Sequence, residues 1–326
     1  VVMEPKTGRI PAMVSLPDFQ PGALSEALKN KNSPMINRAL SNYNCGSVFK
    51  IVTACAALEQ DISTDTRFKC SGSYDIGDVT FHCHNRLGHG TLNMQNAFAQ
   101  SCNPYFIQLA LLMGGQSLYK MAVALGFDRP IILAEGWKTA RAVIPSDIDL
   151  MSPAAVGNFA FGQGSLLATP VHFAQLVAAV VNNGNMIRPA LLKGTISADG
   201  VVNEEKPAPS QTVFSEKTAQ KLRELMANAV ENGTGKSAHP FDGGAGGKTG
   251  TAETGILTDG KSVLQGWFAG FYPKEDPEYV IVVLAEDTGG TGGKASPVFK
   301  QICEDLSMLK KSREHARLRS AGEPSA

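Results

Sequence analysis

The chain has 326 residues, of which 43% are hydrophobic and 18% charged, so it holds enough apolar side chains for one large domain or two closely packed subdomains. Its 30 basic and 30 acidic residues give a formal net charge of zero, which argues against nucleic-acid binding because that function needs a basic surface. No window of about 18 apolar residues is free of polar interruption, so the sequence predicts no membrane span. The chain opens on Val1-Val2-Met3, in a predicted strand without an initiator methionine, and we expect it to be a piece of a longer protein.

The first candidate reactive group is Ser47, which follows Gly46 and precedes an apolar run that ends at Leu58. The pattern predicts a loop that ends at Gly46 and a buried helix with Ser47 at its N-terminus. Lys50 lies three residues further on, so its side chain shares a helix face with the Ser47 hydroxyl. Burial would lower the pKa of Lys50 and make its neutral amine a base, and the helix N-terminus favours developing negative charge. Ser-x-x-Lys alone is more often an N-cap serine with a solvated lysine one turn later.

A cysteine-rich segment follows. Gly77-Asp78 separates two β-prone stretches and predicts a hairpin in which residue 76 pairs with residue 79. This register makes Cys70 and Cys83 diagonal neighbours, and His89 follows a few residues later. Two thiols and an imidazole so close in sequence leave three interpretations open: free thiols, a zinc site and a disulfide. The candidates for a fourth ligand are Asp75 and His84.

Two helical patterns flank a polar break. Apolar residues recur at helical spacing over residues 92–98 and again over 106–112. Between them, Ser101-Cys102-Asn103 is followed by Pro104, a residue suited to the first turn of a helix. A break of this kind can direct the Ser101 and Asn103 side chains into a cleft, although the same residue types also make ordinary helix–helix turns.

A third motif is Lys248-Thr249-Gly250-Thr251. Its residues are small and polar for a strand, and glycine in a strand often marks the close approach of a ligand or another backbone. Two predicted strands follow at 265–272 and 278–285, joined by a turn with a proline at each end. We therefore expect residues 248–252 to form the edge of an antiparallel sheet, along which a peptide can pair. A phosphate-binding loop is excluded because the Gly-x-x-x-x-Gly-Lys-Ser/Thr spacing is absent.

Ser-x-x-Lys, Ser-x-Asn and Lys-Thr-Gly in this order are the signature of serine acyl-enzymes that act on D-alanyl peptides or on β-lactams. Together with Phe161-Gly162-Gln163-Gly164 and the hairpin-like residues 3–10, they resemble the transpeptidase domain of a class B penicillin-binding protein over nearly the whole chain. The surroundings of Ser47 resemble division and sporulation members, and the cysteines resemble clostridial relatives that bind zinc near the active site. One departure is Cys45, where the family usually has proline.

The resemblance implies an α/β (α+β) fold of the penicillin-binding transpeptidase and serine β-lactamase type, with helices flanking an antiparallel sheet and an all-helical subdomain. It places the transpeptidase domain at 1–308, with the all-helical part at about 60–165, and leaves a charged C-terminal tail at 309–326.

The resemblance also implies roles for four catalytic residues. Ser47 would attack the carbonyl between the last two D-alanines of a peptidoglycan stem peptide, and Lys50 would take its proton. Ser101 would relay a proton to the leaving amine, assisted by Lys248. An amine of a second stem peptide would then resolve the acyl-enzyme as a crosslink.

The resemblance also implies which residues of the second and third motifs bind the substrate. Asn103 would hold the substrate amide by hydrogen bonds. Thr249 and Thr251, on either side of Gly250, would bind the terminal carboxylate. The backbone N–H groups of Ser47 and Thr251 would form an oxyanion hole.

The implied partners are the donor and acceptor stem peptides, β-lactams and a glycosyltransferase in the membrane. The implied location is the extracytoplasmic face of the bacterial membrane, with an anchor outside this chain. No cofactor is expected for catalysis, and the metal would be a structural zinc ion. Two other functions share the three motifs. One is a β-lactam sensor domain. The other is a serine β-lactamase, which needs a deacylating base; no clear candidate glutamate lies between Asn103 and Lys248, and only Glu135 is left open.

Overall fold

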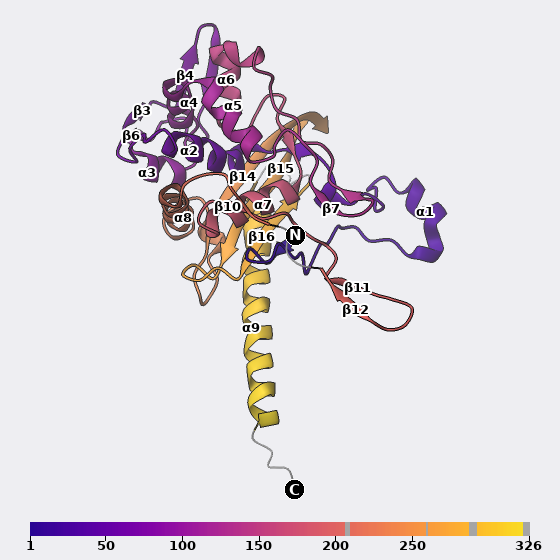
Figure 1. Ribbon diagram of the computed structural model, residues 1–326. Helices are drawn as coiled ribbons and strands as arrows, with labels where there is room; N and C mark the ends of the chain where they lie inside the picture. The colour runs from indigo at the N-terminus through magenta and orange to yellow at the C-terminus, as the bar shows by residue number, and fades with distance from the viewer. Residues whose placement is uncertain (206–208, 259, 287–291, 322–326) are drawn as a thin grey trace.

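A four-stranded antiparallel sheet forms the centre of the computed structural model, which describes residues 1–326 except 206–208, 259, 287–291 and 322–326 (Figure 1). The strand order is β1-β16-β15-β14, so the strand that carries Lys-Thr-Gly is the predicted edge strand. The predicted hairpin of the last two strands is also confirmed. The strands are β1 (Val2–Met3), β14 (Gly246–Thr258), β15 (Lys261–Tyr272) and β16 (Tyr279–Ala285).

Alternating side chains of β15 face two separate layers of the core, because successive residues of a strand point to opposite sides of the sheet. On one side, the Trp267 ring packs against Phe173 of α7 (Pro170–Val181), with ring centroids 5.3 Å apart. On the other side, Phe268 packs against Phe299 of α9 (Ala295–Ala321) at 4.4 Å. The sheet is therefore covered on both faces. Helix α8 (Glu216–Glu231) packs against α7 and the edge strand.

The stretch from 60 to 165 differs from the prediction, because it is not all-helical. It holds four α-helices and a 3-10 helix (Asp149–Met151), and it also holds three two-stranded sheets: β3 with β6, β4 with β5, and β7 with β8. The helices are α3 (Met94–Ala99), α4 (Asn103–Met113), α5 (Gly115–Ala124) and α6 (Pro153–Ala160). The strands are β3 (Phe68–Cys70), β4 (Ser73–Ile76), β5 (Val79–His82), β6 (Gly90–Leu92), β7 (Ile132–Ala134) and β8 (Trp137–Lys138). Helix α2 (Lys50–Leu58) packs against α4 and α5 of this part and against α8.

The hairpin predicted around Gly77-Asp78 is confirmed, since Ile76 pairs with Val79. The Cys83 N–H also donates to Gly72 O at 2.9 Å, as that register requires.

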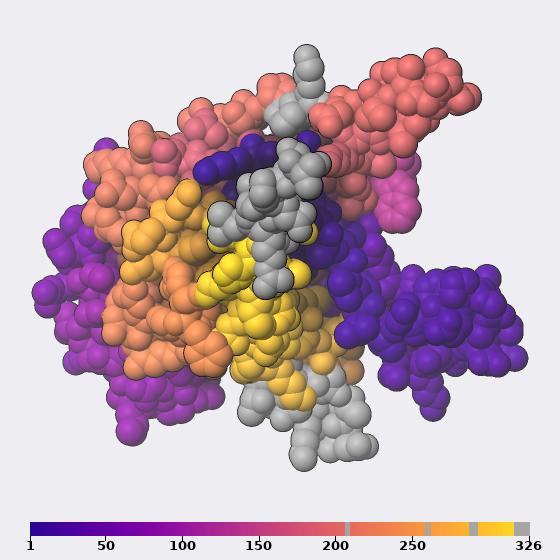
Figure 2. Space-filling model, turned by 90° about the horizontal axis from the view of Figure 1, so that it is seen from below, coloured from indigo at the N-terminus to yellow at the C-terminus, as the bar shows by residue number. Residues whose placement is uncertain are grey.

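Besides the C-terminal part of α9, two segments stand out from the body (Figure 1). One carries α1 (Leu24–Lys29) and forms the indigo lobe of Figure 2, and the other carries β11 (Gly194–Ile196) and β12 (Val202–Glu204). The remaining strands are β2 (Tyr43–Asn44), β9 (Leu167–Ala168), β10 (Asn185–Met186) and β13 (Gln211–Thr212).

The predicted tail at 309–326 continues α9 as helix as far as Ala321. Within the described parts of the chain, no helix is both long and apolar enough to cross a bilayer.

Candidate active site

Ser47 lies in the first turn of the predicted helix. A 3-10 helix, Gly46–Phe49, continues directly into α2. The Lys50 side chain is fully buried, and its Nζ lies 2.9 Å from Ser47 Oγ. Ser47 itself is partly exposed. The helix therefore presents a solvent-accessible hydroxyl with a buried amine directly behind it.

Two other backbones hold the turn that carries Ser47. Gly46 has a φ of +59°, and its N–H donates to Gly162 O at 2.8 Å. A Cβ on Gly162 would lie 1.9 Å from Gly46 O, and a Cβ on Gly46 would lie 2.4 Å from Thr251 O. Only glycine permits this close approach. The Phe161-Gly162-Gln163-Gly164 string thus supports the nucleophile turn, which in turn packs on the Lys-Thr-Gly strand.

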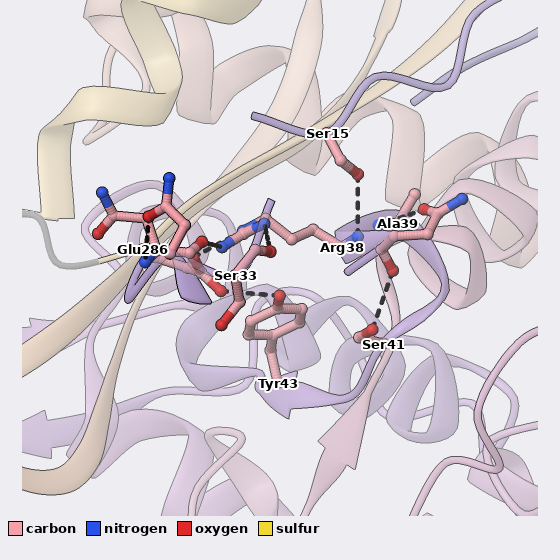
Figure 3. A network of polar contacts seen from close by, with 10 residues as sticks. Ser15, Ser33, Arg38, Ala39, Ser41, Tyr43 and Glu286 are labelled. Atoms are coloured by element: carbon pink, nitrogen blue, oxygen red, sulfur yellow. Dashed lines mark hydrogen bonds and ion pairs between the residues drawn. The ribbon is translucent and has the colours of Figure 1, made fainter. Parts of the chain in front are cut away.

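A polar network fixes the segment that leads into this turn (Figure 3). Tyr43 Oη donates to Glu286 Oε1 at 2.8 Å, and Arg38 Nε donates to Glu286 Oε2 at 2.7 Å. Burial, with the Glu286 contact, raises the pKa of Tyr43, so its hydroxyl stays protonated and continues to donate. Glu286 follows directly after β16, so the network ties residues 38–43 to the C-terminal end of that strand. Cys45, at the usual proline position, has a φ of −85°, close to the value that proline imposes.

Ser101 occupies a strained position between α3 and α4. Its N–H donates to Phe98 O and the N–H of Cys102 donates to Ala97 O, which is the bonding pattern of a Schellman cap. Ser101 stands where glycine is usual and has a φ of +53°, a conformation that costs a non-glycine residue about 1–2 kcal/mol. The cap directs its hydroxyl between two amines, 3.3 Å from Lys50 Nζ and 2.9 Å from Lys248 Nζ.

The orientation of the Asn103 side chain explains how Lys50 can act as a base. Asn103 Nδ2 donates to His82 O at 3.0 Å, which turns its Oδ1 toward Lys50 Nζ at 2.7 Å. Lys50 Nζ also donates to Ser101 O at 2.7 Å. Both oxygens are acceptors only, and a neutral amine has two N–H groups and one lone pair. With both N–H groups used in this way, the lone pair of Lys50 is left for the Ser47 hydroxyl proton.

Burial shifts both lysines of the site toward the neutral amine. It lowers the pKa of Lys50 to about 7, against opposing electrostatic effects of Cys102 and Cys83. Lys248 on β14 is also fully buried, and burial, with a further contribution from the charge of Lys50, holds its pKa well below the usual range. Two amines so close together in a buried site cannot both carry a proton cheaply. The pair is therefore suited to exchanging protons with the two serine hydroxyls.

The strand that carries Lys-Thr-Gly is pressed against the nucleophile turn. A Cβ on Gly250 would lie 3.0 Å from a Val48 methyl group and 3.1 Å from Cys45 O. Thr251 is exposed and Thr249 is partly exposed. Since β14 is the edge of the sheet, a peptide can pair with it beside Ser47.

A second cluster lies directly behind the Ser-x-Asn motif. Cys70 ends β3, Cys83 follows β5, His89 precedes β6 and Cys102 caps α4, and their ligand atoms lie within 4.8 Å of one another. His89 Nδ1 is 3.6 Å from Cys70 Sγ and 3.4 Å from Cys83 Sγ, and tetrahedral zinc requires about 3.6 Å between such atoms. A hydrogen bond from the Cys102 thiol holds the pKa of Cys83 well below its usual range. This buried set of three cysteines and one histidine could hold a metal ion.

The fourth member of this cluster corrects the sequence-based prediction of Asp75 or His84. Both of those residues are exposed, and His84 Nδ1 lies 4.0 Å from Cys83 Sγ. Cys102 is the fourth member of the cluster. It is not recognisable as a ligand from the sequence because it is the middle residue of the Ser-x-Asn motif. All six cysteines are free thiols, so Cys70 and Cys83 do not form a disulfide.

The structure brings the predicted site residues of all three motifs together, although they lie up to about 200 residues apart. The contacts of Lys50 with Ser47, Ser101 and Asn103, and of Lys248 with Ser101, are all within hydrogen-bonding distance. The sequence alone does not reveal Cys102, Glu286 or Thr234, whose hydroxyl lies 2.8 Å from Thr249 Oγ1. Cys102 left a signal, a third cysteine close to two others, whereas Glu286 and Thr234 carry no local pattern.

Comparison with known proteins agrees with this geometry. The family described as penicillin binding protein transpeptidase domain matches residues 1–304. Stage V sporulation protein D of Bacillus subtilis is 31% identical over 320 residues, which cover 94% of this chain and 48% of that protein. Peptidoglycan D,D-transpeptidase PbpA of Mycolicibacterium smegmatis is 33% identical over 326 residues, covering 91% and 64%. The chain thus spans about half to two thirds of the length of these relatives.

Solved structures show the same fold. Penicillin-binding protein A of M. tuberculosis, as a ceftriaxone acyl-enzyme complex, matches with a TM-score of 0.84 and 27% identity over 92% of this chain and 71% of that chain. A D,D-transpeptidase domain from Eggerthella lenta matches with a TM-score of 0.84 and 29% identity, covering 94% and 77%. The predicted fold class is confirmed, and the chain belongs to the penicillin-binding protein transpeptidase domain family.

Proposed function

We propose that this chain is a serine D,D-transpeptidase domain that crosslinks peptidoglycan stem peptides and is acylated by β-lactams. The observation that carries the proposal is a continuous line of polar contacts from Ser47 Oγ to Lys50 Nζ, Ser101 Oγ and Lys248 Nζ, with successive distances of 2.9, 3.3 and 2.9 Å. One end of the line is an accessible nucleophile and the rest can carry its proton away. The ceftriaxone acyl-enzyme of the M. tuberculosis relative supports the same chemistry.

Acylation would begin when Ser47 Oγ bonds to the carbonyl carbon of the penultimate D-alanine and neutral Lys50 takes the hydroxyl proton. The N–H groups of Ser47 and Thr251 would stabilise the oxyanion that forms. As the C–N bond breaks, the Ser101 hydroxyl would give its proton to the departing D-alanine amine. It would then recover a proton from Lys50, which holds the one taken from Ser47. Lys248, 2.9 Å from Ser101 Oγ, would favour that transfer. An acceptor amine would then attack the ester and return Ser47 to its hydroxyl form.

Substrate binding would use the groups left available beside this line. One N–H of Asn103 Nδ2 is bonded to His82 O, so the second is available for a substrate carbonyl. Thr249 and Thr251 would bind the terminal carboxylate, and Gly250 would let the strand approach the nucleophile turn.

The subgroup and setting form a further part of the proposal. The similarity to Stage V sporulation protein D supports a class B, sporulation- or division-type member, and the cysteine cluster supports a clostridial-like one. Such a protein would act on the extracytoplasmic face of the membrane, anchored by a segment outside this chain and working with a glycosyltransferase.

The test of the proposal is the rate of β-lactam turnover. Among the described residues, no carboxylate hydrogen-bonds Ser47 or Lys50, and Glu135 lies exposed in the turn between β7 and β8. Without a base to activate water, the acyl-enzyme should last many minutes. A chromogenic cephalosporin should therefore give one equivalent of product and then very slow release. Hydrolysis at many turnovers per second would show a β-lactamase instead.

We also propose that Cys70, Cys83, His89 and Cys102 bind a structural zinc ion. Because metal binding to a closed site is coupled to folding, purified protein should contain close to one zinc per chain, and a strong chelator should lower its melting temperature by several degrees. Cys102→Ser should lose the zinc, as measured by elemental analysis. Since Cys102 lies between Ser101 and Asn103, loss of the metal should also slow acylation.

The matched control for the metal site is Cys303→Ser, the same change at a buried thiol of α9 outside the cluster. This variant should keep its zinc. Protein purified without chelators that contains no metal, with Cys70 and Cys83 both alkylated in the native state, would refute the site.

A further inference from the structure

A residue outside the three motifs contacts the hydroxyl of Thr249. Thr234 Oγ1 lies 2.8 Å from Thr249 Oγ1, and either oxygen can be the donor. Thr234 is exposed and Thr249 partly exposed, so the pair is open to solvent beside the Lys-Thr-Gly strand. Lys248 Nζ lies 3.5 Å from the same Thr249 oxygen. Thr249 therefore lies between a buried amine and a second hydroxyl.

The backbone, not the side chain, places Thr234. It lies in the turn after α8, where its N–H donates to Ala99 O at 2.9 Å, at the end of the helix that leads to Ser101. The flanking Gly233 allows that approach, since a Cβ there would lie 2.3 Å from Ala99 O. The N–H of Gly235 returns to Ala229 O at 2.9 Å and closes the helix end. A change of the Thr234 side chain leaves all of these contacts in place.

The proton count of the two hydroxyls gives the contact a direction once substrate binds. A hydroxyl has one proton to donate, and a carboxylate only accepts. If Thr249 donates to the substrate carboxylate, its proton is used, and its contact with Thr234 must then run from Thr234 to Thr249. A donor at this distance polarises the second hydroxyl and strengthens its bond to an anion.

We propose that Thr234 is a positioning residue for the terminal carboxylate of the substrate: it donates to Thr249 Oγ1 and so holds the Thr249 proton toward the carboxylate. This inference rests on the proposed function, because it assigns a further residue to the substrate site of the same reaction. Its consequence is selective. Loss of the Thr234 hydroxyl affects ligands that carry the carboxylate and has a much smaller effect on ligands that lack it.

The test compares a carboxylate-bearing thioester substrate with its methyl ester, using kcat/KM from thiol release. Thr234→Val keeps the shape and removes the hydroxyl. It should lower kcat/KM for the acid about tenfold, the effect of losing support for one hydrogen bond to a charged group, and lower kcat/KM for the ester far less. Thr234→Ser restores the hydroxyl and should recover most of the preference for the acid.

The matched control is Thr212→Val, the same change at an exposed threonine whose hydroxyl donates to Asn185 Oδ1 at 2.7 Å. This variant should leave kcat/KM unchanged for both the acid and the ester. Equal losses for acid and ester in Thr234→Val, or no loss in either, would overturn the positioning role. Penicillin acylation of Ser47 in the wild-type protein, measured in parallel, tests the proposed function separately. If the wild-type protein forms the adduct but Thr234→Val keeps the wild-type preference for acid over ester, only this inference is wrong. If the wild-type protein forms no adduct, both the inference and the proposed function are wrong.

Discussion

Replacing Ser47 by alanine is expected to abolish the covalent penicillin adduct completely. Ser47 Oγ is the accessible hydroxyl that Lys50 Nζ contacts from the buried side at 2.9 Å. Alanine removes the atom that forms the ester and leaves the helix intact, since alanine is the best helix former. Intact-protein mass spectrometry after incubation with penicillin should therefore show only the unmodified mass.

The control for this variant is Ser210→Ala, a serine exposed on the surface between β12 and β13. It should acquire the adduct at the wild-type rate. An adduct that persists in Ser47→Ala would assign the nucleophile to another residue.

Replacing Lys50 by alanine should lower the acylation rate by about a thousandfold or more, because nucleophile and base act as a unit. Lys50→Arg should be equally slow, since a guanidinium keeps the charge but cannot accept a proton at neutral pH. Lys221→Ala, on the surface of α8, is the matched control and should leave the rate unchanged.

The wild-type rate should also depend on pH in a defined direction. The pKa of Lys50 is about 7 because the side chain is buried. Above that pH the amine is neutral and the rate should be level; as the pH falls through about 7 the amine becomes protonated and the rate should fall. A Lys50→Ala protein that acylates at the wild-type rate, or a wild-type rate that rises as the pH falls, would contradict the assignment of the base.

Much of the site could be predicted because its reactive residues lie in three short contiguous motifs. The Ser47–Lys50 contact follows from a spacing of three on one helix, and the edge strand follows from a glycine-containing string ahead of two clear strands. The Ser101 position also follows from the break between two helical patterns. Its left-handed conformation does not, because serine has no strong local preference for it and tertiary contacts impose it.

The missed features depend on contacts between distant segments. Cys102 reaches the other thiols only because α4 starts beside β3 and β5, and Thr234 reaches Thr249 only because α8 ends beside β14. Glu286 contacts Tyr43 although the two residues lie 243 positions apart in the sequence. The short strands between 60 and 165 are two to four residues long, too short for alternation to separate them from loops. Such placements are set by packing, which a single sequence does not display.

The central claim is that Ser47 forms a long-lived acyl-enzyme. The most direct measurement incubates the wild-type protein with penicillin, removes the excess, follows the intact mass over time and maps the modified peptide. We predict a single penicillin adduct, located on Ser47, that decays over many minutes. A protein that gains no mass, carries the adduct on another residue, or loses it within seconds would contradict the account.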